Sequence, residues 1–185
     1  MKNENMPKLL EKIELVVYAD NVPLRQNIDL SRDVGKRLAK TLGANIDVVE
    51  MGTLLMDCAL GHAIKENRQG EHVQMSLEKA NELLVESDLS EEEKENIRRC
   101  ILEHHGVSRF SSLESEIVCN ADCYRFVSIK GFCFAMRYLR DMPFDELVSL
   151  LKRKVDEKWN ALSLDIAKKE ITSQYQTIVQ ILKGL

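Results

Sequence analysis

The sequence predicts an all-α fold. Apolar residues recur at three- and four-residue spacing along most of the chain, whereas β-branched residues rarely alternate with polar ones. Only three prolines and eight glycines occur in 185 residues, so few breaks separate the helical stretches. The length suits one domain with a sizeable core, and no internal repeat or low-complexity tract suggests a boundary. We therefore expect a single domain over residues 1–185.

Three helices are predicted in the first third of the chain, at about residues 8–18, 30–42 and 47–57. Pro23 breaks the pattern between the first two, and Gly43 is a plausible C-terminal stop for the second. Asn45 or Asp47 can cap the third helix, because both side chains accept hydrogen bonds from backbone amides. The apolar residues of this third helix lead directly to Asp57.

A polar stretch, residues 62–70, is predicted to be a loop, and an amphipathic helix follows over 73–84. Near the C-terminus, Pro143 stands at the head of another helix, and a long last helix covers roughly 163–182. The apolar residues of these C-terminal helices have the spacing of core packing. Any apolar surplus on them could form the face of a homodimer.

Two capping boxes are predicted in the central part of the chain. Ser90 and Glu93 have the Ser-x-x-Glu spacing in which each side chain satisfies a backbone amide at a helix start. Ser111 and Glu114 repeat that signature. The first box opens a helix that runs toward a histidine pair, and the second opens a helix that runs toward Asp122.

Composition excludes several classes of protein. The net charge of −4 gives no sign that a nucleic-acid polymer is a partner, and a small phosphorylated molecule would need local cations or a metal. No apolar run approaches the roughly 18 residues of a membrane span, and the first residues lack a signal-peptide core. Five scattered cysteines without a CxxC pair argue against structural zinc. We expect a cytoplasmic protein without membrane contact.

Five residues are candidates for a metal site: His72, His104, His105, Asp57 and Asp122. Each acid follows an apolar helical stretch, where a carboxylate is costly unless it is paired or bound to metal. Imidazole and carboxylate together suit several divalent ions, and helices hold such ligands rigidly. The alternative is ordinary: acids at helix ends are often solvated, and adjacent histidines suit a helix C-terminus.

Four segments of the chain, taken in order, resemble the HD superfamily of metal-dependent phosphohydrolases. The family pattern is a helix that ends Leu-Leu-His-Asp, a His-x3-Ser-x3-Ala helix, an Ile-x-x-His-His element and a final Leu-Glu-x-x-Ile helix that ends Ala-Asp. The matching segments are Gly43–Asp57, His72 with Ser76 and Ala80, Ile101–His105, and Leu113–Asp122. The match covers about residues 24–130 with its spacing kept.

The resemblance implies a small stand-alone HD-domain protein, a compact multi-helix bundle whose motif-bearing core lies at about 24–130. Helices in 131–185 are expected to pack on that core. The implied cofactor is a divalent ion (Mn, Mg, Fe, Ni, Co or Zn). The implied reaction is hydrolysis of a nucleotide or another small phosphoester, in which Asp57 and Asp122 hold or orient the metal and its water.

The chain departs from the family pattern at two ligand positions. Met56 stands where the family has the histidine of its His-Asp pair, and counting back from Gly43 places Asn27 where the first histidine should be. Methionine sulfur is a poor ligand for hard or borderline ions, and an asparagine carbonyl brings no negative charge. If both assignments hold, the usual one-metal site is degenerate.

A partial site can still be assembled. In family members with two metals, the aspartate of the pair bridges them and the later histidines hold the second ion. Asp57 with His72, His104 and His105 could then hold one ion in that second position. Lys65 and Arg68, in the 62–70 stretch, are candidates for contact with a substrate phosphate, although a solvated basic loop is the favoured explanation of both.

Two hypotheses from different classes follow. The first is a metal-dependent phosphohydrolase that acts on a small phosphoester, which the retained histidines and Asp122 favour. The second is a catalytically inactive binding or regulatory module that keeps the helical pocket, which the loss of the histidine at position 56 favours. The sequence leaves both open.

Overall fold

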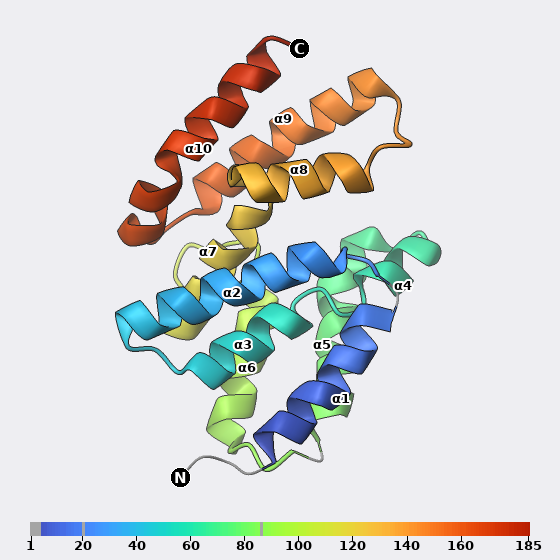
Figure 1. Cartoon of the computed structure of the whole chain (residues 1–185). Coiled ribbons are helices and arrows are strands. Elements are labelled where there is room, and N and C mark those ends of the chain that lie inside the picture. Colours follow the sequence, from blue (N-terminus) through green and yellow to red (C-terminus); the bar gives the residue numbers. More distant parts are fainter. Residues whose placement is uncertain (1–4, 20, 86) are drawn as a thin grey trace.

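The computed structural model describes residues 5–19, 21–85 and 87–185, and within them the chain is all-α, as the sequence predicts. Figure 1 shows the helices crossing one another in a bundle, with the C-terminal helices gathered at one end. The elements, in chain order, are α1 (Met6–Ala19), α2 (Arg25–Leu42), α3 (Ile46–Leu55), α4 (Leu60–Lys65), the 3-10 turn η1 (Gln69–Glu71), α5 (His72–Leu84), α6 (Glu91–Glu103), α7 (Leu113–Val127), α8 (Ile129–Tyr138), α9 (Phe144–Ala161) and α10 (Asp165–Lys183). No helix of the described residues is long and apolar enough to cross a bilayer.

The main core lies between α2, α3, α6 and α7. Helices α3 and α7 pack against each other, and α2 and α6 each pack against both of them. It is built from the apolar faces of these helices, and its fully buried members include Leu38, Leu55, Ile97 and Ile117. A close approach at Gly52 sets the spacing, because a Cβ there would lie 2.7 Å from Cys100 Cβ on α6. This glycine lets α3 lie tightly on α6 and α7, so the ends of the three helices come together.

The caps of α2, α3 and α6 are those that the sequence predicts. Gly43 ends α2 with φ of 74°, a conformation that glycine adopts without strain. The Asn45 side chain accepts hydrogen bonds from the amides of Asp47 and Val48 at the start of α3. Ser90 opens α6 with a complete capping box. Sequence signals therefore fix the end of α2 and the starts of α3 and α6, the two helices that lead to Asp57 and to the histidine pair.

The C-terminal helices α8, α9 and α10 enclose a second, smaller apolar cluster, which includes Phe132, Val155 and Ile178. α9 also packs along α7. Asn120 on α7 ties down the connection from α9 to α10, because its Oδ1 accepts from the amides of Ser163 and Leu164 at 3.2 and 3.1 Å. This attachment fixes α9 against the helix that carries Asp122.

Two predictions about local structure are wrong. The stretch 62–70 is not one loop, because α4 extends to Lys65. Its sequence reads as polar, yet Gly61 and Ala63 are buried where α4 packs on α5, and this contact holds the short helix in place. Residues 66–68 alone connect α4 to η1.

The second wrong prediction is the capping box at Ser111 and Glu114. The box is formed one residue later, by Ser112 and Ser115. Ser111 instead donates its amide to Glu103 at 3.0 Å, and its hydroxyl also bonds to that carboxylate. Glu114 accepts from the Asn45 amide at 2.8 Å, so it ties α7 to the start of α3.

Candidate metal centre

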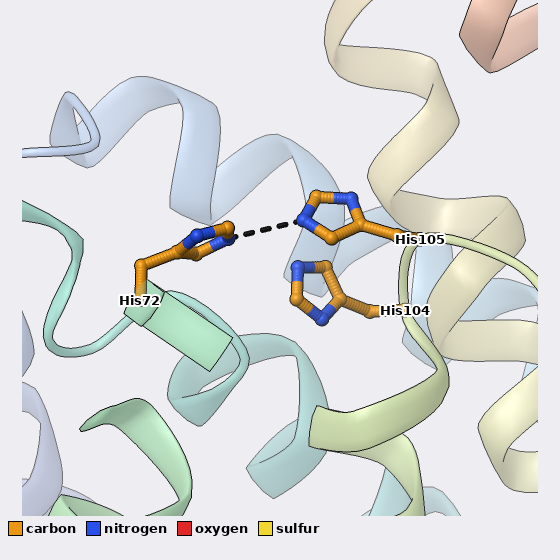
Figure 2. A group of neighbouring side chains, drawn as sticks. All are labelled: His72, His104 and His105. Atoms are coloured by element: carbon orange, nitrogen blue, oxygen red, sulfur yellow. Dashed lines mark hydrogen bonds between the residues drawn. The ribbon is translucent and has the colours of Figure 1, made fainter. Parts of the chain in front are cut away.

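The five predicted site residues come together at one place. Asp57 lies in the turn after α3, His72 is the first residue of α5, and Asp122 lies within α7. His104 caps the end of α6, and His105 follows it. Because the histidine pair stands where the helix ends, both rings turn toward the same space, and Figure 2 shows them facing His72. One coordinating atom from each of the three histidines lies within 4.8 Å of the others.

Backbone carbonyls fix the tautomers of two of these rings. His72 Nδ1 lies 2.6 Å from the Gln69 oxygen, and His104 Nδ1 lies 2.7 Å from the Ile101 oxygen. A carbonyl only accepts hydrogen bonds, so each Nδ1 carries the proton and each neutral ring leaves a lone pair on Nε2. This is the way in which proteins commonly orient a metal-binding imidazole. The Nε2 atoms of His72 and His104 can therefore each offer a lone pair to a metal ion.

His105 is held differently. Lys158 Nζ lies 3.0 Å from its Nδ1, and since an ammonium group only donates, this nitrogen accepts. The neutral ring then carries its proton on Nε2, which lies 3.0 Å from His72 Nε2 (the dashed line in Figure 2). His105 donates that hydrogen bond, so its Nε2 can bind a metal only after the contact is broken.

Asp57 turns one oxygen toward a cation and the other toward two histidines. Its Oδ2 accepts from the Arg125 guanidinium at 2.5 Å. Its Oδ1 lies 3.5 Å from the Nε2 atoms of both His72 and His104. Among the described residues, neither this oxygen nor His104 Nε2 makes a hydrogen bond, although both are buried. Unsatisfied buried polar atoms are costly, so their convergence indicates space for a bound group.

Asp122 uses both of its oxygens on cations. Its Oδ1 accepts from Arg125 Nη1 at 2.8 Å, and its Oδ2 forms an ion pair with Lys158 Nζ at 2.6 Å. The same Arg125 nitrogen thus contacts Asp57 and Asp122 together. All three side chains are at most 7% exposed, and Lys158 is 2% exposed.

The four charged groups keep one another ionised. Burial raises the pKa of Asp57, but the charge of Arg125, with His104 beside it, outweighs burial and holds that pKa well below its usual value. Burial likewise raises the pKa of Asp122, and Lys158 and Arg125 together lower it more. Burial lowers the pKa of Arg125, yet Asp57 and Asp122 together raise it. Burial likewise lowers the pKa of Lys158, and the neighbouring Asp122 raises it. The quartet is therefore electrically neutral near neutral pH.

Sequence reasoning missed Arg125 and Lys158. Arg125 had a local signal, because it lies three residues after Asp122 and so on the same helical face. Lys158 had none, since it reaches the site only through the packing of α9 on α7.

A cavity of about 400 Å³ opens at the centre, and Asp57, His72, His105 and Asp122 line it. Its cationic wall contains Arg125, Lys158 and Lys154. Leu60 and Phe126 contribute apolar surface. The cavity therefore offers positive charge and apolar contact beside the histidines.

The remaining predicted positions lie elsewhere. Met56 is 1% exposed and belongs to the apolar core, and Asn27 is buried on α2; neither lines the cavity. Lys65 and Arg68 do not line it either. Arg68 is exposed, pairs with Glu66 and Glu71, and borders a different cavity of about 500 Å³. Their placement gives no support to a role in phosphate contact at the histidines.

The residues fit a divalent ion on one side only. His72, His104 and Asp57 Oδ1 supply a mixed imidazole and carboxylate donor set, and His105 can join it. On the other side, a guanidinium already lies between Asp57 and Asp122, and the predicted ligand positions Asn27 and Met56 hold a buried amide and a thioether. A metal that needs those positions does not fit.

Comparison with known proteins bears on the fold. No family model matches the chain. Over 116 residues, 62% of its length, the chain is 33% identical to Ribonuclease Y of Finegoldia magna, and it spans only 20% of that protein.

Solved structures match almost the whole chain. A predicted HD superfamily hydrolase from an uncultured Thermotogales bacterium superposes with a TM-score of 0.70 at 14% identity, over 97% of this chain and 90% of the other. Bacillus subtilis YpgQ gives 0.70 at 16% identity, over 97% and 95%. Its complex with ADP gives 0.71 at 15% identity, over 97% and 94%. The chain therefore has the HD-superfamily fold, as its motifs predict.

Proposed function

We propose that this chain is a metal-dependent phosphohydrolase with one divalent ion, which acts on a nucleotide or another small phosphoester. His72, His104, His105 and Asp57 would hold the ion. The observation that carries the proposal is the convergence of two prepared imidazole nitrogens on an unengaged carboxylate oxygen, each at 3.5 Å from it. Such an arrangement leaves the buried Asp57 Oδ1 and His104 Nε2 without a partner unless a cation binds there.

Each group has a distinct part. A divalent ion in this position supplies a Lewis acid that polarises a phosphoryl oxygen and activates water near neutral pH. The Gln69 and Ile101 carbonyls hold His72 and His104 in the binding tautomer. Asp57 contributes Oδ1 while Arg125 anchors its other oxygen. Asp122, with both oxygens engaged, positions Arg125 and Lys158 at the cavity wall.

The cavity supports a phosphorylated substrate. Lys154, Lys158 and Arg125 line it, and they offset the net negative charge of the chain at this place. Leu60 and Phe126 offer apolar surface to the organic part of the molecule. The structural neighbour YpgQ has been crystallised with ADP, which also favours a nucleotide here. The relative named Ribonuclease Y makes an RNA oligonucleotide a necessary second substrate in any screen.

A binding module without turnover is the second candidate. It is favoured by the Arg125 guanidinium between Asp57 and Asp122, because this contact stabilises the acids without a metal. The buried Met56 favours it as well, since a thioether replaces a ligand nitrogen of the family pattern. In that case the cavity would bind a phosphorylated molecule and release it unchanged.

A metal and substrate screen separates the two candidates. Purified protein is assayed for bound metal, then for phosphate release from nucleotides, p-nitrophenyl phosphate and a single-stranded RNA, each with Mn, Mg, Fe, Ni, Co or Zn. We expect turnover that needs a divalent ion, and we expect His104→Gln to abolish it. His62→Gln is the matched control, because His62 is an exposed histidine paired with Glu66 on the neighbouring α4.

Turnover that survives His104→Gln would reject the proposed centre. A protein that binds nucleotide at the cavity, measured by calorimetry, but shows no turnover with any of these ions supports the binding module instead.

A further inference from the structure

Two buried acids and two buried bases form a closed set beside the histidines. Arg125 Nη1 contacts Asp57 at 2.5 Å and Asp122 at 2.8 Å, and Lys158 Nζ contacts Asp122 at 2.6 Å. The formal charges cancel. Three of the four carboxylate oxygens are engaged by a cation, and only Asp57 Oδ1 faces the histidines.

A guanidinium between two buried carboxylates neutralises their charge, as a divalent ion bound in the same place would. Two buried acids repel each other, and their burial is expensive unless a positive charge lies between them. Arg125 supplies that charge from α7, and Lys158 adds a second from α9. The cation is covalently part of the chain, so it is present whether or not any metal is available.

We propose that Arg125 and Lys158 take the place of a divalent ion beside Asp122, so that the centre is assembled without metal and accepts at most one ion, on its histidine side. Asp122 is then a positioning residue and not a metal ligand. The claim about the bound ion rests on the proposed metal centre, whereas the claim about the metal-free fold does not.

The test compares two arginines by the same substitution. The protein is stripped of metal with a chelator, and the melting temperatures of wild type, Arg125→Met and Arg37→Met are measured by calorimetry. Arg37 is the matched control because it forms a two-bond pair with Glu170, at 2.6 and 2.7 Å, but on the surface. We expect Arg125→Met to melt about 10 °C or more below wild type, and Arg37→Met within about 3 °C of it.

Metal content is the second readout. Wild-type protein is dialysed against Mn²⁺ or Zn²⁺ and bound metal is counted per chain. We expect one equivalent or fewer. Two equivalents would mean that the guanidinium yields its position to an ion and would overturn the proposal, as would an Arg125→Met loss no larger than that of Arg37→Met.

A charge-balanced variant covers the case in which Arg125→Met does not fold. Arg125→Met/Asp57→Asn keeps the Asp122–Lys158 pair and removes the acid that loses its partner. We expect it to melt above Arg125→Met, and a value at or below that of the single variant contradicts the proposal. A protein with no bound ion and no turnover would reject the proposed function but leave these melting temperatures as expected.

Discussion

The Lys158 ammonium group lies 3.0 Å from His105 Nδ1 and 2.6 Å from Asp122 Oδ2, so one buried lysine joins the carboxylate side of the centre to its histidine side. The contact sets the tautomer of His105, because the ammonium group can only donate. It also places a positive charge beside the position that a metal would take. The pKa of His105 is lowered by partial burial of its ring and by the neighbouring His104 and Lys158.

Lys158→Met should strengthen metal binding. The change removes a positive charge from beside the ion and releases Nδ1 of His105, so that its Nε2 becomes available. We expect the affinity for Zn²⁺ or Mn²⁺ to rise by about tenfold or more, in competition with a chromophoric chelator. Lys154→Met is the control, since Lys154 lies one turn earlier on α9 and pairs with Glu157 at 2.8 Å. Unchanged or weaker metal binding in Lys158→Met would show that the contact between Lys158 and His105 does not lower the metal affinity of the centre.

His104→Gln should weaken metal binding far more than His62→Gln. His104 is fully buried with an unsatisfied Nε2, whereas the His62 side chain is 61% exposed. Loss of an outer partner of a ligand already costs about 10- to 100-fold in affinity, so loss of the ligand itself should cost at least as much. Calorimetric titration with Zn²⁺ measures both variants. Equal Zn²⁺ affinities of the two variants would show that His104 is not a metal ligand.

Acid should destabilise the protein through Asp57 and Asp122. Both carboxyl groups have pKa values below their usual value of about 4 in the folded protein, so the unfolded chain binds more protons as the pH falls. Their stabilising contribution is fully present above about pH 5 and is lost as the pH falls toward the folded pKa values. Each depressed carboxyl contributes on the order of 1.4 kcal/mol per pKa unit.

Urea unfolding of metal-free protein at a series of pH values from 7 to 3 measures this effect. Asp122→Asn should start from a lower stability at pH 7 and lose less on acidification than wild type does. An equally steep loss in the variant would assign the acid lability to other groups.

Gly52→Ala should separate the helices that carry the site. The added Cβ would lie 2.7 Å from Cys100 Cβ and 2.9 Å from Val118 Cγ2, so α3 must move away from α6 and α7. We expect a loss of about 1–3 kcal/mol in the free energy of unfolding. Gly70→Ala is the control, because no described atom outside its neighbours lies within 4 Å of a Cβ there. A neutral Gly52→Ala would show that this close approach does not set the helix spacing.

Histidines placed at positions 27 and 56, as in the HD pattern, should not create a second metal site. Met56 is packed in the core, so Asn27→His/Met56→His should cost stability. We expect this double variant to bind no additional Zn²⁺ while Arg125 remains between Asp57 and Asp122. A second equivalent of bound metal, counted after dialysis, would show that the residues at positions 27 and 56, and not Arg125, prevent a second ion from binding.

Much of the fold was accessible from the sequence because its signals are local. Asn45 and Ser90 cap helices through side chains two or three residues from the amides they satisfy, and Gly43 acts through its own backbone. Local signals could not decide whether Ser111 or Ser112 caps α7, because each is followed three residues later by a polar side chain that can complete a capping box. Glu103, which binds the Ser111 amide at 3.0 Å, decides between them from another helix.

The candidate site likewise contains residues that local sequence patterns predict and residues that only tertiary packing places there. The ordered motifs brought Asp57, His72 and the histidine pair together correctly, because spacing along helices reflects where helix ends meet. They could not show Lys158, whose position depends on how Asn120 fixes the α9–α10 connection on α7. Charge partners supplied by tertiary packing leave no local pattern.

The most direct test of the metal centre is the number of divalent ions bound per chain in wild type and in His104→Gln, measured side by side after anaerobic loading and dialysis. The proposed centre predicts one equivalent in wild type and a clear loss in the variant, with one ion held by His72, His104, His105 and Asp57. Two equivalents in wild type, or the same content in both proteins, would contradict it.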